Sequence, residues 1–417
     1  MLYGWELLSG DEKKLIADGI KKCAVLGGPY HLVLFPTDRC NLDCFFCYTE
    51  TLRKQAKELE WDVLKAALQK GVDMGVKSVS LGGGGEPLIY KKLAPLLDFI
   101  EQRHVKVDSI KTNGTALIPE AAEQLIRCDL GRITISLNDT RAEEYARICK
   151  ASPHLFDKAM AGLKNIVRAK NKAGSDCEIS TQVFVWRDNY QRLPEMIDDL
   201  IPTGTDLIYV NTIDGLDEDL KMSKNQKEEF KKILAPIIEK HARIIQFNLS
   251  AEGLHQFAIE RQYQIYPEAI HPPGICRTNH RVEFCYIGWI AAVIEANGDV
   301  YPCCHFTTDL GKSLGNLHDQ SLEEIWYGER SRKFRGEMRH LLLTHADPGL
   351  LPRRPRFIYH RCLNRTSCAF NFFLCDPDFY MDMYNWSLQA GPAYRTSYKL
   401  KTLPLRAARK IKRMLGP

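Results

Sequence analysis

Short apolar, β-branched runs alternate with longer stretches of helical spacing through the first 245 residues. Strands are predicted at residues 31–36, 78–81, 108–112, 132–137, 178–185 and 207–212. Between the strands, apolar residues recur three or four positions apart, as Leu64, Leu68 and Val72 do, which is the period of an amphipathic helix. The same spacing predicts a last helix over residues 224–241. The order predicts an α/β fold in which each of six parallel strands is followed by a helix.

Two architectures accommodate six such strand–helix units. The parallel sheet can curl into a partial barrel, or it can remain open as a doubly wound sheet, and periodicity does not separate the two. We assign the units to residues 26–245, after an N-terminal extension of residues 1–25, and read residues 246–274 as a connection.

The pattern changes after residue 274. Two apolar runs at residues 289–294 and 300–301 flank the sequence Asn297-Gly298-Asp299, which is a strong hairpin signal. A helix is predicted over residues 321–338, where Ser321 and Glu324 have the spacing of a capping box. Residues 275–390 are therefore expected to form a second, small α+β unit.

Positive charge is concentrated in the tail at residues 391–417. The whole chain has a net charge of +5, which is too small to indicate nucleic-acid binding by itself. Eight Lys and Arg residues and no acid lie in the tail, so the rest of the chain is net −3. The tail also places Leu405, Ala408 and Ile411 on one helical face. This pattern suits contact with an anionic lipid surface or an acidic partner, and it equally describes a solvated helix end.

The chain has no apolar run of the roughly 18–20 residues that a membrane helix needs. Its first 15 residues include Glu6, Asp11 and Glu12 and do not resemble a signal peptide. A cytoplasmic location is therefore expected. There the 14 cysteines would stay reduced, available for metals or chemistry and not for a disulfide framework.

Three cysteines, Cys40, Cys44 and Cys47, occur within eight residues, between a predicted strand and a helix. Iron–sulfur cubanes are held by thiolates, normally four, so a loop with three leaves one iron open to another ligand. The alternatives are a zinc site or coincidence. A zinc site needs a fourth local ligand, and the nearest histidine is His31, on the strand.

This C-x3-C-x2-C loop after the first strand of a predicted barrel resembles the radical S-adenosylmethionine (SAM) enzymes. The resemblance implies a partial (β/α)6 barrel and a [4Fe–4S] cluster on Cys40, Cys44 and Cys47, whose open iron binds SAM. It places Phe46 near the adenine and implies reductive cleavage of SAM to a 5′-deoxyadenosyl radical. A reducing partner such as flavodoxin or ferredoxin would then be required.

Further segments at strand ends resemble parts of this family. Residues 82–87 read Gly-Gly-Gly-Gly-Glu-Pro, where glycines let the backbone approach the methionine ammonium. The Asn-Gly turn at residues 113–114 and the Ser-Leu-Asn segment at 136–138, which has Asn where the family has Asp, also match. A simple turn is the alternative for the first two segments, and a solvated helix residue is the alternative for Arg147. The resemblance implies the following cofactor contacts: Phe46, Gly83, Gly84, Gly85, Glu86, Asn113, Ser136, Asn138, Arg147, Gln182 and Val183.

Seven more cysteines lie between residues 276 and 375. Cys285 and the segment from Gly298 to Cys303 are similar to the hairpin of SPASM and twitch extensions, which bind auxiliary [4Fe–4S] clusters. Two thiolate-ligated clusters need eight cysteines, so one cluster is the simpler prediction, and two clusters with a substitute ligand is the alternative. The predicted auxiliary ligands are Cys285, Cys303 and two of Cys362, Cys368 and Cys375.

Cys304 and Cys276 remain as candidate hydrogen-atom donors to a carbon radical, with an inert thiol or a cluster ligand as the alternative. The function expected by resemblance is dehydrogenation or epimerisation of a sugar-like small molecule. Modification of a ribosomal peptide is the first alternative. A non-catalytic iron–sulfur electron carrier is the second.

Overall fold

The computed structural model describes residues 4–47, 49–212, 220–249, 253–265, 285–304, 313–344 and 376–414. The helices are η1 (Trp5–Leu7), α1 (Gly10–Lys22), α2 (Glu50–Arg53), α3 (Trp61–Met74), η2 (Pro87–Ile89), α4 (Leu93–Gln102), α5 (Pro119–Arg127), α6 (Ala142–Cys149), α7 (His154–Ala173), η3 (Tyr190–Arg192), α8 (Leu193–Leu200), η4 (Ile201–Thr203), α9 (Lys224–His241), α10 (Leu254–Ile265), η6 (Ile287–Trp289), α12 (Leu322–Tyr327), α13 (Glu329–Thr344) and α16 (Pro377–Met414). The strands are β1 (His31–Leu34), β2 (Ser78–Leu81), β3 (Lys106–Thr112), β4 (Arg132–Asn138), β5 (Glu178–Val185), β6 (Leu207–Thr212), β7 (Ile245–Asn248), β8 (Ala291–Ile294), β9 (Asp299–Tyr301) and β10 (Gly315–Asn316).

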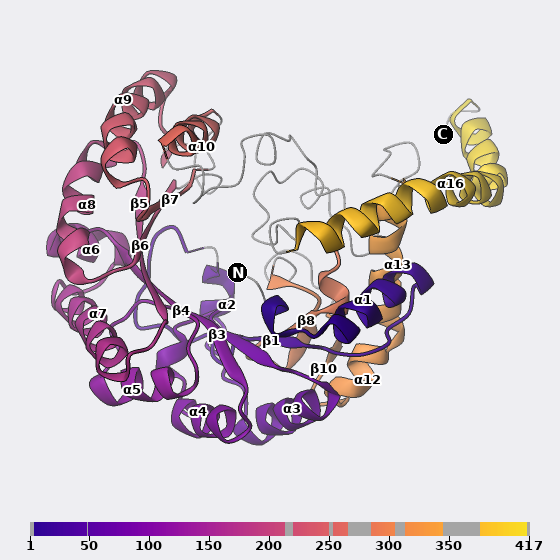
Figure 1. Ribbon diagram of the computed structural model, residues 1–417, viewed down its shortest axis with the longest axis horizontal. Coiled ribbons are helices and arrows are strands. Elements are labelled where there is room, and N and C mark those ends of the chain that lie inside the picture. Colours follow the sequence, from indigo (N-terminus) through magenta and orange to yellow (C-terminus); the bar gives the residue numbers. More distant parts are fainter. Residues whose placement is uncertain are drawn as a thin grey trace.

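The strands of the described chain form one sheet in the order β10-β9-β8-β1-β2-β3-β4-β5-β6-β7. From β1 to β7 each strand pairs in parallel with the next one along the chain. A doubly wound sheet reverses its strand order at a switch point, and this order does not reverse. The sheet curves, and helices α3 to α9 lie along its convex side (Figure 1). The fold is therefore a partial barrel, as one of the two predicted architectures requires.

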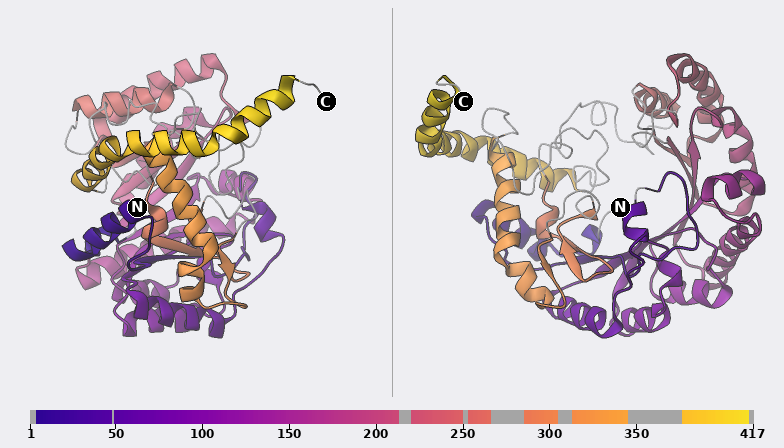
Figure 2. Two further views of the ribbon diagram at one scale, coloured as in Figure 1. Left: turned by 90° about the vertical axis from the view of Figure 1, so that its right-hand side faces the viewer. Right: turned by 180° about the vertical axis from the view of Figure 1, so that it is seen from behind.

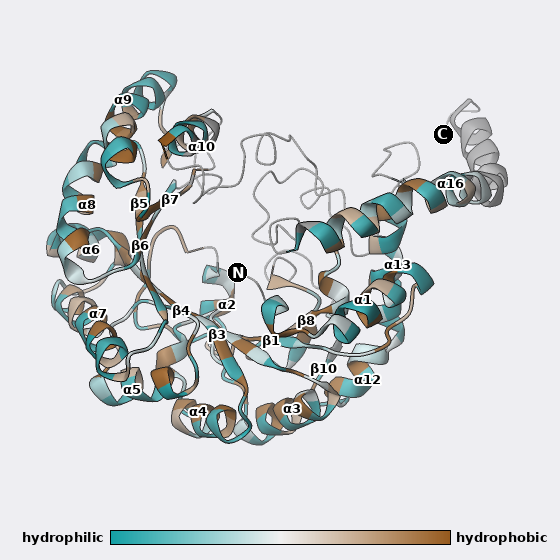
Figure 3. Ribbon diagram, in the orientation of Figure 1, coloured by the Kyte–Doolittle hydropathy of each residue, from teal (hydrophilic) through white to brown (hydrophobic). Residues whose placement is uncertain are grey.

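The two faces of the sheet have different chemistry. On the convex face, Leu32 approaches Gly71 of α3, and Ile135 lies near the α7 backbone. On the opposite face, hydroxyl groups pair across strands: Ser80 with Ser109 at 2.8 Å, and Thr134 with Ser180 at 3.0 Å. The outer surfaces of the helices are mainly hydrophilic (Figure 3). The apolar core thus lies between sheet and helices, and the concave face of the barrel is polar.

All six predicted strands are present, with ends that shift by up to two residues, and the predicted helix over 224–241 is confirmed as α9. We predicted that residues 246–274 form a connection without regular structure. For residues 246–249 and 253–265, which the structure describes, this prediction was wrong. The strand β7 begins at Ile245 and extends the parallel sheet beside β6, and α10 follows it. The four-residue alternation of β7 is too short to stand out in the sequence.

The predicted hairpin is confirmed as β8 and β9, with the positive φ of Gly298 at its turn. The hairpin does not form a separate sheet. Strand β8 pairs in parallel with β1, from His31↔Ala291 to Leu34↔Ile294. The barrel sheet therefore continues across the boundary that we expected near residue 275.

The helix predicted over residues 321–338 is two helices, α12 and α13, because the chain extends at Gly328 between them. The capping box of Ser321 and Glu324 is confirmed. Helix α16 packs against α13 (Figure 2), where His340 bonds to the Tyr394 hydroxyl at 3.0 Å. It continues as a helix into the basic tail. Within the described chain, α16 and every other helix lack an apolar stretch long enough to span a bilayer.

Candidate iron–sulfur and cofactor site

The three-cysteine loop follows β1, and neighbouring segments fix its backbone. The amide of Asp43 donates to the carbonyl of Cys149 at 2.9 Å, and the amide of Phe45 donates to the carbonyl of Ile148 at 3.1 Å. The Arg53 guanidinium of α2 donates to the Leu42 carbonyl at 2.8 Å. The loop is therefore held between α2 and the end of α6.

The side chains of Cys40, Cys44 and Cys47 are partly buried. The Asn113 amide nitrogen lies 4.0 Å from the Cys40 sulfur, and the Thr49 hydroxyl oxygen lies 3.2 Å from the Cys47 sulfur. The Cys149 thiol is the electrostatic neighbour that most affects the pKa of Cys44. Each thiol therefore has a polar neighbour from another part of the chain or from the loop itself.

Protonation of these thiols opposes metal binding. Burial raises the pKa of the Cys40 thiol to about 11. The Cys149 thiol, together with burial, raises the pKa of the Cys44 thiol. Because a cysteine ligates metal as the thiolate, loading this loop releases protons.

The glycine-rich segment lies directly against the cysteine loop. The amide of Gly85 donates to the Thr37 carbonyl at 3.0 Å, and the Thr49 hydroxyl donates to the Gly84 carbonyl at 2.8 Å. A β-carbon on Gly85 would lie 2.0 Å from the Arg39 carbonyl oxygen. Close backbone approach requires glycine at this position.

Glu86 is buried at 3% exposure and joins the ends of two strands. Its carboxylate accepts hydrogen bonds from the Thr112 hydroxyl at 2.6 Å and from the backbone amides of Asn113 at 2.7 Å and Leu88 at 3.0 Å. Burial raises the pKa of this carboxyl group, and the three donors oppose that shift. The glutamate therefore shapes the segment itself, and its contact with the cofactor stays a prediction.

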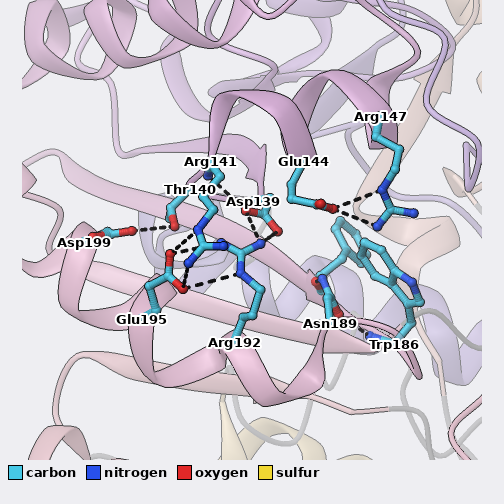
Figure 4. A network of polar contacts seen from close by, with 11 residues as sticks. Asp139, Thr140, Arg141, Glu144, Arg147, Trp186, Asn189, Arg192, Glu195 and Asp199 are labelled. Atoms are coloured by element: carbon cyan, nitrogen blue, oxygen red, sulfur yellow. Dashed lines mark hydrogen bonds and ion pairs between the residues drawn. The ribbon is translucent and has the colours of Figure 1, made fainter.

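Aromatic rings line the next part of the site. The Phe46 and Phe184 ring centroids are 4.3 Å apart, and those of Phe45 and Trp186 are 5.6 Å apart. The Arg147 guanidinium lies 5.7 Å from the Trp186 centroid and pairs with Glu144 at 2.8 Å (Figure 4). The expected contact of Arg147 with the methionine carboxylate stays a prediction.

Strands β4 and β5 contribute the remaining predicted cofactor contacts. Ser136 and Gln182 are register partners, so they share the concave face. Val183 alternates with Gln182 along β5 and is fully buried on the other face. Asn138 follows a register shift and has a positive φ of 66°. Its amide nitrogen donates to the Cys149 sulfur at 3.3 Å.

Of the predicted auxiliary ligands, the described residues include Cys285, just before η6, and Cys303, just after β9. Cys303 is buried, whereas Cys285 and the candidate donor Cys304 are partly exposed. The remaining four cysteines of this group lie outside the described residues: Cys276, Cys362, Cys368 and Cys375. The auxiliary ligand set therefore stays a prediction.

The donor set on the first loop fits a cubane with an open iron. In the described residues, Cys, His, Asp and Glu side chains do not gather in threes around one metal ion. A cubane instead distributes its thiolates over separate iron atoms. Three partly buried thiols on one loop, without a fourth ligand from that loop, match this requirement.

Comparison with known proteins agrees with this chemistry. Residues 34–200 match the model of the radical SAM superfamily, and residues 285–347 match the SPASM model, an iron–sulfur cluster-binding domain. The chain is a radical SAM enzyme with a C-terminal SPASM domain. The radical SAM domain implies a [4Fe–4S] cluster and SAM, and the SPASM domain implies auxiliary iron–sulfur clusters, so the cofactor prediction is confirmed.

Two curated relatives of this radical SAM enzyme align over most of their length. It is 22% identical to the tungsten-containing aldehyde ferredoxin oxidoreductase cofactor-modifying protein of Pyrococcus furiosus, over 73% of this chain and 83% of the relative. It is 26% identical to the mycofactocin maturase MftC of Mycolicibacterium smegmatis, over 74% of this chain and 72% of the relative.

Solved structures share the fold. The radical SAM enzyme superposes on Streptococcus suis SuiB bound to SAM with a TM-score of 0.55 and 19% identity, over 85% of this chain and 81% of SuiB. It superposes on SAM-bound anSMEcpe with a TM-score of 0.54 and 15% identity, over 89% and 95% of the two chains.

Sequence reasoning did not assign Cys149 or Thr49 to this site. Thr49 lies two residues after Cys47 and carries no pattern of its own. Cys149 is more than 100 residues from the loop in sequence, and only the return of the chain through α6 brings its carbonyl to the Asp43 amide. No local signal identifies either residue.

Proposed function

We propose that this radical SAM enzyme abstracts a hydrogen atom from a peptide substrate and uses an auxiliary cluster in the subsequent oxidation. Similarity to the maturase MftC over most of both chains carries the proposal. Two structures that share this fold are peptide complexes: SuiB bound to the precursor peptide SuiA, and anSMEcpe with bound SAM and a peptide.

The chain's own residues would position the cofactors. Cys40, Cys44 and Cys47 would hold the [4Fe–4S] cluster, which would supply the electron for the reductive cleavage of SAM. Arg53 and the end of α6 hold the cysteine loop, and the loop packs against Gly84 and Gly85. Phe46 and Phe184 offer aromatic surface for the adenine.

The concave face of the sheet suits a polar substrate. Its concave face bears the hydroxyl pairs of Ser80 with Ser109 and of Thr134 with Ser180. Lys111 is the register partner of Thr134, which places it on this face, and its side chain is exposed. We propose that these residues line the space into which the substrate enters.

The test uses anaerobically reconstituted protein with dithionite, SAM and a synthetic peptide encoded next to its gene. We expect 5′-deoxyadenosine and a peptide that has lost two hydrogen atoms, both detected by mass spectrometry. Formation of 5′-deoxyadenosine with every such peptide unchanged would remove the peptide proposal and leave the radical SAM assignment intact.

Dehydrogenation or epimerisation of a sugar-like molecule is the second candidate. It is supported by the partly exposed thiol of Cys304 beside the predicted auxiliary ligand Cys303, because epimerisation needs a hydrogen-atom donor. In deuterated water an epimerase incorporates solvent deuterium at the inverted carbon. Cys304→Ala would then stop inversion while 5′-deoxyadenosine still forms.

Iron analysis tests the auxiliary site. One auxiliary cubane beside the first cluster gives about eight iron atoms per chain, and two give about twelve. We expect about eight. A flavodoxin or ferredoxin is proposed as the physiological reductant, and replacement of dithionite by either protein tests that role.

A further inference from the structure

We propose that the basic end of α16, residues 399–414, binds the surface of an anionic phospholipid bilayer and so holds this radical SAM enzyme at a membrane. Two features support this proposal: the path of α16 away from the barrel, and the separation of cations from apolar residues along its last turns. Neither feature depends on the choice of substrate.

The first half of α16 is fixed to the rest of the molecule. Just before the helix, the Asp376 carboxylate accepts hydrogen bonds from the indole nitrogen of Trp5 at 3.0 Å and from the Lys13 ammonium at 2.9 Å. Farther along the helix, the Tyr394 hydroxyl lies 3.0 Å from the Nδ1 atom of His340. Because these contacts come from η1, α1 and α13, the helix leaves the body of the protein in a defined direction.

Helix α16 continues past these contacts. It is one helix of 38 residues, from Pro377 to Met414. Its last part extends beyond α13 and away from the barrel (Figure 2). A helix that projects in this way can lie along a surface much larger than the protein.

Cations dominate the projecting part of α16. Residues 399–414 contain no acid and seven Lys and Arg residues: Lys399, Lys401, Arg406, Arg409, Lys410, Lys412 and Arg413. Five apolar residues recur among them at intervals of three or four: Leu400, Leu403, Ala407, Ile411 and Met414. That interval keeps the five positions in one stripe along the helix. Ile411 of the face expected from the sequence belongs to this stripe, and Leu405 does not.

The apolar stripe lies on a different side of α16 from the face that packs against α13. Tyr394 and Tyr398 mark the packed face, since their ring centroids lie 5.7 and 4.5 Å from that of His340. Seven residues make about two turns of helix, so the packed face continues through Lys401 and Leu405. The stripe is therefore not an extension of the apolar contact between α16 and α13.

An apolar stripe with cations around the rest of the circumference is the pattern of a helix that lies in a membrane interface. The stripe enters the boundary between headgroups and acyl chains, while Lys and Arg stay among the anionic headgroups. Nucleic acid would pair with the cations and leave the stripe without a partner. An acidic protein would need a matching apolar groove beside its carboxylates, whereas any anionic bilayer offers both environments.

The test is co-sedimentation of the reconstituted full-length protein with lipid vesicles. We expect binding to vesicles of phosphatidylglycerol and phosphatidylcholine, weaker binding as salt is added, and little binding to phosphatidylcholine alone. Lys410→Gln combined with Arg413→Gln should weaken binding by more than roughly tenfold, because each cation near an anionic surface contributes about fivefold. Ile411→Gln should also weaken it by at least roughly tenfold, because it removes apolar burial.

Lys224→Gln combined with Lys232→Gln is the matched control. It removes the same charge from exposed positions of α9, and its binding to vesicles should equal that of the wild type. Formation of 5′-deoxyadenosine without vesicles should be unchanged in every variant, which shows that the cofactor site is intact.

Three results would overturn the proposal. The first is a wild-type protein that does not bind anionic vesicles, or binds them no better than phosphatidylcholine alone. The second is equal binding of the wild type and both α16 variants, which would leave an acidic protein as the partner of this helix. The third is a control variant that binds as weakly as the variant of Lys410 and Arg413, because total charge and not α16 would then determine binding.

Discussion

Asp139 shows how much a single buried contact can matter near this site. Its carboxylate is completely buried at the end of β4, and one guanidinium nitrogen of Arg192 lies 2.8 and 2.9 Å from its two oxygens (Figure 4). Arg192 also contacts Glu195, which pairs with the exposed Arg141. The network therefore contains one ion pair with a buried carboxylate and two more exposed pairs that share Glu195.

We expect Arg192→Met to destabilise the protein by about 3–5 kcal/mol, because it leaves the Asp139 carboxylate buried without its cation. Arg141→Met is the control. It removes an exposed pair to Glu195 and should cost less than about 1 kcal/mol. Denaturant unfolding of both variants measures the difference. An equal decrease in the free energy of unfolding in the two variants would show that burial of Asp139 does not determine the loss of stability.

Cys44→Ala removes one of the three thiolates of the first loop. We expect 5′-deoxyadenosine formation to fall by more than roughly 100-fold, since loss of even a supporting residue at a metal site costs about 10–100-fold. Chromatography of anaerobic reactions with dithionite and SAM measures this. Cys177→Ala, which changes a buried thiol on another part of the chain, should retain the activity. Turnover like the wild type in Cys44→Ala would contradict the ligand assignment.

At the scale of elements, the site lies where three neighbouring parallel strands end, and the segment that follows each strand contributes to it. The cysteine loop follows β1, the glycine-rich segment follows β2, and Asn113 follows β3. Parallel strands direct their carboxyl ends to the same edge of the sheet, which is where barrel enzymes build active sites. Glu86 links the second segment to the third through Thr112 and Asn113.

Gly85→Ala should disturb this junction. The added carbon would lie 2.0 Å from the Arg39 carbonyl oxygen, so the cysteine loop must shift. We expect a loss of about 1–3 kcal/mol in stability, together with lower iron content and weaker SAM binding. Gly82→Ala is a matched control from the same segment, because nothing lies within 4 Å of its added carbon. Iron analysis and equilibrium binding of SAM measure the effect. Equal iron content and equal SAM affinity in the two variants would contradict the claim that the close contact at Gly85 holds the cysteine loop in place.

At the scale of the whole molecule, β1 lies between the barrel strand β2 and the SPASM strand β8. His31 begins this central strand and is completely buried, with its Nδ1 atom 2.7 Å from the Ser78 hydroxyl. Burial lowers the pKa of His31 to about 3. The ring therefore stays neutral in the folded protein at pH values where the unfolded chain takes up a proton.

The cluster-free protein should become less stable as the pH falls below about 6.5. Between that value and the folded pKa of about 3, the unfolded state binds one more proton, and His31 alone contributes a slope of up to about 1.4 kcal/mol per pH unit. Denaturant unfolding at pH 7, 6 and 5, compared with His31→Gln, measures this contribution. Parallel stability curves for the two proteins would contradict it.

The agreement between sequence and structure depends on how local each signal is. The six strands, the α9 helix and the capping box of Ser321 and Glu324 were predictable because each pattern lies within a few neighbouring residues. Strand β7 was missed because four residues carry too little pattern. The extended backbone at Gly328, which divides the predicted helix 321–338, was also missed.

The sequence by itself determined the chemistry of the first site. Three thiols at the spacing of Cys40, Cys44 and Cys47 are enough to specify an iron–sulfur ligand set, since the ligands belong to one short loop. Only the tertiary structure decided the order of the strands, the pairing of β8 with β1, and the hydrogen bond between the Asp43 amide and the Cys149 carbonyl. Those contacts join residues far apart along the chain, and they exist only after the whole sheet and its helices have packed.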